Sequence, residues 1–354
     1  MELRFDCSDN NPSSFAPVTR RQFVQTVGVG AAAVSLPAAS LPTVALAKGE
    51  TKTKPESLVK TLHASLTPEQ KKQVAFAWDH VDPRTGGKSP LRLHVSNNWH
   101  ITKQKVASSF FTKDQQEMIE AIFFGLYDTD WHDRIRKQLR DDAGGYGRQQ
   151  NIAIFGEPGT GKFEFVMTGR HLTVRCDGDS NDHFSFGGPI FYGHAAQGFN
   201  EKADHAGNVF WHQALKANSL YEMLDGKQRD QALLPKAPGE RLVHFQGQDG
   251  KFPGVAVADL AADQKKVVQD ALGLLVEPYR ASDRTEALKA LKAQGGLDKC
   301  SIAFYKSGDI GKDGVWDNWR LEGPAFVWHW RGAPHVHVWV NVADDPSAKI
   351  TSRG

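Results

Sequence analysis

Cysteine is scarce in this chain, and an excess of charge of either sign is missing. The 354 residues include 3 Cys, none of them in a Cys-x-x-Cys pair. A disulfide-rich scaffold, a thiolate zinc knuckle and a c-type haem site are therefore excluded. Cys176 and Cys300 either form one disulfide in an oxidising compartment or remain two buried thiols. The 43 Lys and Arg nearly balance the 41 Asp and Glu, which gives no electrostatic reason to expect nucleic acid or an anionic membrane as a partner.

Long hydrophobic runs are also missing. Beyond residue 47 no segment approaches the about 20 strongly apolar residues that a membrane-spanning helix needs. Near the N-terminus, Arg20 and Arg21 precede a weakly apolar, Gly- and Ala-rich stretch at 24–47 that ends in Ala-Leu-Ala. A twin arginine, an apolar segment and a small-x-small site are typical of a Tat export signal.

We therefore expect residues 1–47 to be a cleaved Tat signal peptide, with the Tat export machinery as a partner. An N-terminal membrane anchor is the alternative, and the Gly, Ser and Pro of the segment argue against it. The mature protein is then expected to be periplasmic or secreted, without membrane attachment after cleavage. Tat substrates cross the membrane already folded, which suits a protein that receives a cofactor before export.

The rest of the chain predicts a single α+β domain. Apolar residues at helical spacing alternate with short β-branched or aromatic runs bounded by Gly, Asp and Asn. Two β blocks separated by helices predict one antiparallel sheet, built from a central and a C-terminal block and flanked by helices. The expected parts are a linker at 48–55, a domain at 56–346 (helical 56–145, β 151–193, helical 207–293, β 301–342) and a tail at 347–354.

Four expected helix starts share one pattern. Thr67, Thr112, Asp225 and Ala261 are each followed three residues later by Gln. Thr at such a start caps free backbone N–H groups, and the Pro that follows Thr67 is tolerated in the first turn. The spacings between the four are irregular, so the sequence predicts four similar helix starts and no solenoid.

The stretch GEPGTGK at 156–162 fits the first seven positions of a phosphate-binding loop. The eighth position is Phe163, so the hydroxyl that would hold Mg²⁺ is absent. The residues that follow alternate like a strand, whereas the loop needs a helix whose N-terminus faces the phosphates. We therefore expect a hairpin loop and no nucleotide.

The C-terminal run FVWHWRGAPHVHVW at 326–339 is dense in His and Trp. Residues two apart on a strand share a face, so His335, His337 and Trp339 are expected to point the same way. Two His at this spacing are within reach of one metal ion.

The register of the hairpin that precedes these His residues is open. A loop at 331–334 places Trp330 opposite His335 and Trp328 opposite His337, inside an aromatic-walled site. A loop one residue longer brings His329 opposite His335 instead. A change of one residue in register moves every side chain to the other face, so the two predict different neighbours for the His pair.

A third ligand has to come from elsewhere in the chain. His171 opens an expected strand, His100 ends an irregular segment and His194 closes a strand; each is a candidate. A carboxylate, Glu164 or Glu322, could complete the shell. Glu322 is favoured because it directly precedes Gly-Pro at 323–324.

Six short motifs occur in order along the chain: LTPEQ at 66–70, NWH at 98–100, FGEPG at 155–159, GRHL at 169–172, GPIFYG at 188–193 and PHVH at 334–337. Taken together they resemble the bacterial and fungal proteins grouped as domain-of-unknown-function family 3500, whose members often carry export signals. The resemblance covers about residues 57–345.

This chain departs from the family pattern at two positions. Arg170 stands where the family has the first His of a Gly-His-His-Leu turn, and Pro334 where it has Asn. If both His of that turn were ligands in the family, this protein would bind metal differently or not at all. The resemblance implies that the positions to watch are His100, His171, His335 and His337, and it supplies no reaction.

The sequence favours an exported metal-dependent enzyme, an oxidoreductase or a hydrolase. His171, His335 and His337 are the expected ligands, with His100 as a fourth ligand or general acid/base, since imidazole ligates metal and titrates near neutral pH. Copper, iron or zinc suits imidazole. The alternative is a non-catalytic periplasmic protein that binds a metal or a small ligand. A metal-free hydrolase ranks last because no Gly-x-Ser-x-Gly motif occurs.

Overall fold

The structure is a computed structural model that describes residues 54–353 except 88, 199, 202–203 and 311–312. Thr51–Gly354 form one compact unit. The expected signal peptide, and the expected linker apart from its last two residues, lie outside the described residues. No helix in the described part is long and apolar enough to cross a bilayer. Cys176 and Cys300 are buried free thiols, so of the two alternatives for this pair the structure has the unbridged one.

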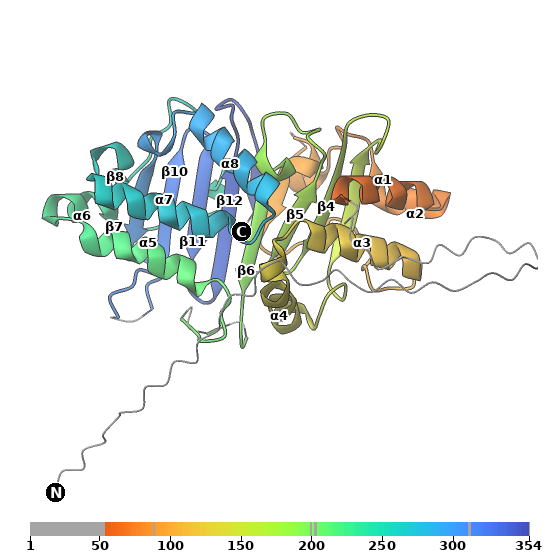
Figure 1. Cartoon of the computed structure of the whole chain (residues 1–354), viewed down its shortest axis with the longest axis horizontal. Coiled ribbons are helices and arrows are strands. Elements are labelled where there is room, and N and C mark those ends of the chain that lie inside the picture. The colour runs from red at the N-terminus through yellow and green to blue at the C-terminus, as the bar shows by residue number, and fades with distance from the viewer. Residues whose placement is uncertain (1–53, 88, 199, 202–203, 311–312, 354) are drawn as a thin grey trace, which may run out of the picture. The chain divides into compact units, whose positions relative to one another are not determined.

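An 11-stranded sheet organises the molecule (Figure 1). Its order is β1-β3-β4-β5-β6-β12-β11-β10-β9-β7, with β8 beside β9 off this path. The bounds are β1 Ala75–Phe76, β3 Asn151–Gly156, β4 Phe163–Gly169, β5 Leu172–Cys176, β6 Ile190–His194, β7 Leu233–Leu234, β8 Val255–Ala256, β9 Ser301–Tyr305, β10 Asn318–Gly323, β11 Phe326–Arg331 and β12 Val336–Val342.

The α+β class is confirmed, but the sheet is mixed and the expectation of a purely antiparallel one is wrong at its two edges. Strand β1 runs parallel to β3, and β7 runs parallel to β9. Each of these two-residue strands directly follows a short helix, and the chain reaches its partner only after further helices, a crossover that returns in the same direction. Their sequences continue a helical pattern, so two residues of strand gave no signal of their own.

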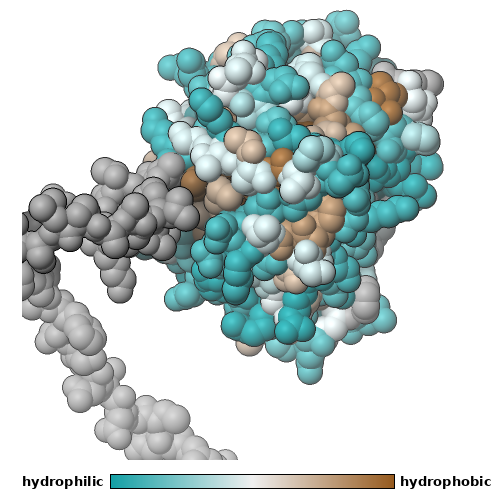
Figure 2. Space-filling model, turned by 90° about the vertical axis from the view of Figure 1, so that its right-hand side faces the viewer, coloured by the Kyte–Doolittle hydropathy of each residue, from teal (hydrophilic) through white to brown (hydrophobic). Residues whose placement is uncertain are grey.

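The helices are α1 Pro55–Ser65, α2 Pro68–Val74, α3 Lys113–Gly125, α4 His132–Ala143, α5 Trp211–Met223, α6 Gly226–Ala232, α7 Ala262–Val276 and α8 Ala281–Ala293. Figure 1 shows α1, α3, α5, α7 and α8 in front of the sheet. The largest apolar cluster lies on this side and joins helix residues such as Ile119 and Leu272 to strand residues such as Trp328. Irregular segments and two smaller apolar clusters cover the opposite face. On the surface drawn in Figure 2, hydrophobic residues form small groups between hydrophilic ones.

The last residues add a small second sheet. Within the expected tail, β13 (Thr351–Arg353) pairs in parallel with β2 (His94–Ser96). The Oγ of Ser352 also lies 3.4 Å from the carbonyl oxygen of Glu240, in the 3-10 helix η5 (Glu240–Leu242). The C-terminal strand therefore braces the irregular layer that carries Glu240.

The sheet consists of two halves with the same strand topology. Counted inward from the edges, β1, β3, β4, β5 and β6 of one half correspond to β7, β9, β10, β11 and β12 of the other. One half runs from α1 to β6 and the other from α5 to β12. The parallel edge pairs have matching registers, Ala75↔Ile154 and Leu233↔Phe304. The tight hairpins β4–β5 and β10–β11 both close on a Gly, at 169 and 323. Strands β6 and β12 pair antiparallel in the middle, so the halves are related by an approximate twofold rotation.

The four similar helix starts pair up according to this duplication. Gln70 and Gln115 exchange hydrogen bonds of 2.9 and 3.1 Å between their side-chain amides, and Gln228 and Gln264 do the same at 3.1 and 2.8 Å. Each Gln also accepts a hydrogen bond from the backbone N–H that precedes its own helix. The shared sequence pattern thus marks one helix junction in each half.

Both expected registers of the C-terminal hairpin are wrong. Arg331 lies opposite His337, Trp330 opposite Val338 and His329 opposite Trp339. Trp330 faces the helices and packs in the largest apolar cluster, so the indole belongs to the core and not to the wall of the His site. His329 does share a face with His337, but it lies opposite Trp339, four residues further along β12 than the expected partner His335.

Candidate metal centre

Three His side chains converge on one point beside the middle of the sheet. The Nε2 atom of His171 lies 3.1 Å from that of His335 and 3.2 Å from that of His337, and the last two are 3.1 Å apart. No further His, Cys, Asp or Glu of the described ranges joins this group of possible ligands. All three rings are buried, with 3, 5 and 5% of each residue exposed.

Local sequence explains why these rings meet. His171 is the second residue of the two-residue turn between β4 and β5, with φ at +55°, in the left-handed region. Strand β6 separates this hairpin from β12, and Gly193 on β6 pairs with His337. A Cβ atom at Gly193 would lie 2.4 Å from the carbonyl oxygen of Val336 and 3.4 Å from the His171 ring. Glycine therefore leaves the space through which His171 reaches β12.

Carboxylates hold two of the three rings from behind. The Nδ1 atom of His171 lies 2.9 Å from Oδ1 of Asp142 on α4, and Nδ1 of His337 lies 3.0 Å from Oε1 of Glu240. A ring whose Nδ1–H donates to a carboxylate presents the lone pair of Nε2 to the opposite side. Carboxylate–histidine pairs of this kind fix the tautomer and orientation of metal-binding imidazoles.

The convergence of these nitrogens has an electrostatic consequence. When Nδ1 carries the proton, Nε2 of His171 and Nε2 of His337 are both acceptors, and they lie 3.2 Å apart. Burial, and after it the charge of Arg331 and the neighbouring imidazoles, hold the pKa of His337 well below its usual value. The ring is therefore neutral, the form that binds metal, and a cation at the point of convergence would satisfy the lone pairs.

An apolar wall borders the His cluster. The Phe191 ring packs edge-on against His337 at 5.2 Å between centroids, and it contacts Trp339 at 4.6 Å. Trp339 shares the face of His337, as the strand periodicity predicts. The expected aromatic neighbours Trp328 and Trp330 lie on the other face of the sheet.

His100 does not join the cluster. Its side chain is exposed, and its Nδ1 contacts Oδ1 of Asn151, at the start of β3. The structure therefore does not place it as a fourth ligand. The segment that carries it still borders the site, because the backbone N–H of His171 donates to the carbonyl of Asn97.

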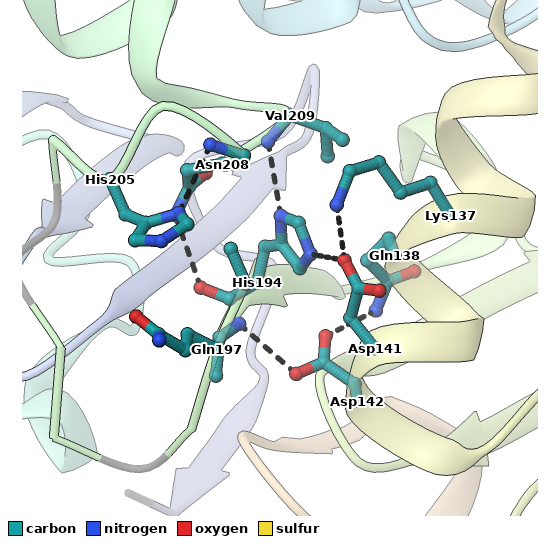
Figure 3. Close-up of polar contacts among 12 residues, drawn as sticks. Lys137, Gln138, Asp141, Asp142, His194, Gln197, His205, Asn208 and Val209 are labelled. Carbon is teal, nitrogen blue, oxygen red and sulfur yellow. Dashed lines mark hydrogen bonds and ion pairs between the residues drawn. The ribbon is translucent and has the colours of Figure 1, made fainter.

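His194 is also separate from the three, although it closes the strand beside them (Figure 3). Its Nδ1 accepts the backbone N–H of Val209, and its Nε2 lies 2.9 Å from Oδ2 of Asp141. Asp141 and Asp142 are neighbours on α4, so one helix end holds both His194 and the ligand candidate His171. In this role His194 ties the end of β6 to α4 and to the chain before α5.

The two carboxylates considered for the metal shell have other partners. Glu164 is fully buried against Arg175, with Nη1 and Oε1 2.5 Å apart. Glu322 accepts a hydrogen bond of 2.8 Å from Gln246 and lies 3.7 Å from Arg320. Asp142 and Glu240, which do contact the cluster, belong to no recognisable sequence motif. The one local signal is that Asp142 lies near the Gly-Gly that ends a helix.

These features define the class as an α+β protein with a buried three-histidine cluster supported by carboxylates. The family model described as Protein of unknown function (DUF3500) matches residues 48–341, and the chain belongs to this family. The match confirms the resemblance seen in the ordered motifs. No curated protein and no solved structure matches the chain.

Proposed function

We propose that this protein is an exported metal-dependent enzyme whose ion is bound by His171, His335 and His337. The observation that carries the proposal is the convergence of three Nε2 atoms within 3.1–3.2 Å, two of them on rings held by carboxylates. Three protein ligands leave at least one coordination position for water or substrate, which is the arrangement of catalytic rather than structural metal sites.

The distances between the three Nε2 atoms limit the choice of metal ion. Nitrogens about 2.0–2.1 Å from one ion are about 3.3 Å apart in a tetrahedral shell and about 3.0 Å apart on one face of an octahedron. The observed 3.1–3.2 Å suits either, and so favours zinc or iron. A square-planar Cu(II) shell would hold two of three nitrogens about 4 Å apart, so copper fits only in a non-planar form.

The bound ion would supply Lewis-acid chemistry, or electron transfer if it is redox-active. Asp142 and Glu240 would keep the imidazoles in the binding tautomer, and Phe191 would limit the access of water on one side. The twin-arginine segment supports delivery to the periplasm or the exterior, by a route that accepts a folded protein with its metal already bound.

The burial of the three rings favours one rival, a non-catalytic metal-binding protein. A closed coordination shell would support it, and an exchangeable water or anion on the metal would support the enzyme. Binding of azide to the Co²⁺-loaded protein, followed by visible absorption spectroscopy, separates the two.

The first test is elemental analysis of the mature protein purified from its native export route. The matched sample is a His335→Ala/His337→Ala double variant with native circular dichroism. Near-stoichiometric zinc or iron in the native protein, absent from the variant, supports the proposal and names the metal. A native protein without metal contradicts it.

A further inference from the structure

Arg331 is the charged side chain directly across from the ligand candidate His337. The two residues are paired on the adjacent strands β11 and β12. Residues opposite each other in an antiparallel pair have Cβ atoms about 4.5–5.5 Å apart on the same face of the sheet. Arg331 is also the more accessible of the two, because 24% of its side chain is exposed against 6% for His337.

One carboxylate oxygen joins this arginine to the metal ligand. Oε1 of Glu240 lies 3.1 Å from Nε of Arg331 and 3.0 Å from Nδ1 of His337. The other oxygen of Glu240 accepts a hydrogen bond of 3.2 Å from the side-chain amide of Asn97. The guanidinium is thus held beside the His cluster through its inner nitrogen.

The outer edge of the guanidinium is not used by this ion pair. A guanidinium has five N–H donors arranged as a planar fork, and Glu240 contacts only Nε. The Nε atom lies at ion-pair distance from Glu240 without a hydrogen bond, and Arg331 forms no ion pair with any other described residue. A fork that is fixed at one end and accessible at the other suits a planar carboxylate.

The charges around the cluster also favour an anion. Asp142 and Glu240 contribute two negative charges beside the cluster, and Arg331 contributes one positive charge at Glu240. A bound divalent ion would leave this group of charges with a net positive charge. A site of this kind attracts an anionic ligand.

We propose that Arg331 binds a carboxylate of the substrate while a second oxygen group of the same molecule coordinates the metal, which makes Arg331 the specificity-determining residue. This inference rests on the proposed metal site and names its substrate class, small molecules with a carboxylate next to a metal-binding group. Glu240 then orients both the imidazole of His337, which binds the metal, and the guanidinium of Arg331, which binds the substrate carboxylate.

The test uses the mature protein loaded with Co²⁺, whose visible absorption reports ligand binding. The probes are malonate, which has two carboxylates, and acetate, which has one. We expect the native protein to bind malonate about 10- to 100-fold more tightly than acetate, the range of one added charged hydrogen-bonded contact. Arg331→Gln should lose most of this preference, with its acetate affinity within about threefold of native.

Two further variants control the comparison. Arg229→Gln changes an exposed arginine on α6 and should keep the native preference. Arg331→Lys keeps the charge without the planar guanidinium and should give an intermediate preference for malonate over acetate. If Arg331→Gln does not load cobalt, Arg331→Lys is the variant that tests the role of Arg331. Phosphonoacetate as a third probe shows whether a phosphonate serves as well as a carboxylate at Arg331.

The outcomes separate this inference from the proposed function. Equal affinities for malonate and acetate in a cobalt-loaded native protein, or an unchanged malonate preference in both Arg331 variants, would overturn the role of Arg331 and leave the metal site standing. A native protein that takes up no cobalt would overturn both.

Discussion

The two halves of the sheet have the same topology, but within the described residues only one end of their shared axis holds a three-histidine cluster. His171 directly precedes β5, and its counterpart Ala325 directly precedes β11. His335 and His337 lie at the start of β12, whereas the matching stretch before β6 is a 3-10 helix, η4 (Ser185–Gly187). The duplicated scaffold thus supplies two similar corners, and the side chains placed on them make one corner polar and the other apolar.

The helix ends behind these corners differ in the same way. Asp142, near the end of α4, accepts from the His171 imidazole and from the backbone N–H of Ala195. Gln294, after the end of α8, accepts from the backbone N–H of Ala325 and donates to the carbonyl oxygens of Ala325 and Ala343. The amide closes its corner with neutral hydrogen bonds, whereas Oδ1 of the carboxylate contacts an imidazole as well as a backbone N–H. The two corners of the duplicated fold therefore differ in a few side chains.

The largest expected effect comes from making the two corners alike. His171→Ala gives the first corner the residue of the second and removes one of three ligands, so metal should be lost at micromolar concentrations. His100→Ala is the matched control, because His100 contacts Asn151 and not the cluster. Elemental analysis of both variants after dialysis is the measurement. Retained metal in His171→Ala would exclude a three-histidine site.

The supporting carboxylate should matter less than a ligand. Asp142→Asn keeps the shape of the side chain and removes the charge that orients His171, so metal affinity should fall by about 10- to 100-fold. Competition with a chromogenic chelator measures it. Gln294→Asn, at the other corner, should leave metal affinity unchanged; an equal fall in both variants would mean that general destabilisation is responsible.

Gly193 and its counterpart Ala343 offer a steric form of the same comparison. Gly193→Ala places a Cβ atom 2.4 Å from the carbonyl oxygen of Val336. Overpacking of this kind costs about 1–3 kcal/mol of unfolding free energy. Chemical denaturation measures the loss, and metal affinity should fall with it because the His171 ring is displaced. Ala343→Gly should leave metal binding intact.

The paired glutamines test whether the two halves contribute equally to stability. Gln70→Ala breaks a reciprocal amide pair and two further hydrogen bonds, and should cost about 1–3 kcal/mol because Gln70 is buried. Gln228→Ala breaks the corresponding pair at a more exposed position and should cost less. Urea denaturation of the two variants measures both losses of unfolding free energy. A larger loss for Gln228→Ala would contradict the argument from burial.

The smallest effect concerns pH. Burial, and after it the nearby carboxylates Asp177 and Asp283, raise the pKa of Glu286 to about 7. The folded protein therefore holds this proton more tightly than the unfolded chain. The resulting stability is fully present below the usual glutamate pKa and is lost as pH rises through about 7. Glu286→Gln should lose less stability than the native protein between pH 5 and pH 8, as thermal denaturation at both values can show.

Sequence patterns predicted local structure well where a residue type acts on its own neighbours. The capping residues Thr67, Thr112 and Asp225 each begin a helix, as predicted, because a cap works within four residues. The GEPGTGK segment at 156–162 leads into a strand, β4, and not into a helix, as predicted. The edge strands β1 and β7 were missed, because two residues of strand are stabilised by a distant partner and not by their own sequence.

The candidate site shows the same difference between features set by local sequence and features set by tertiary packing. Strand periodicity alone placed His335, His337 and Trp339 on one face. The burial of Trp328 and Trp330 among the helices is incompatible with the first expected register, which placed both indoles on the face of the His pair.

The sequence by itself determined the α+β class, the helix starts, the shared face of the C-terminal His pair and the family. The expected ligand set of His171, His335 and His337 also came from the sequence and its family resemblance. The tertiary structure alone decided that His100 and His194 lie outside the cluster, that Asp142 and Glu240 contact its rings, and that the chain builds its sheet twice. The physical reason is distance along the chain. Caps and strand faces depend on neighbours a few residues away, whereas His171 and His337 meet across 166 positions, through a Gly-sized gap in β6 that only the folded sheet creates.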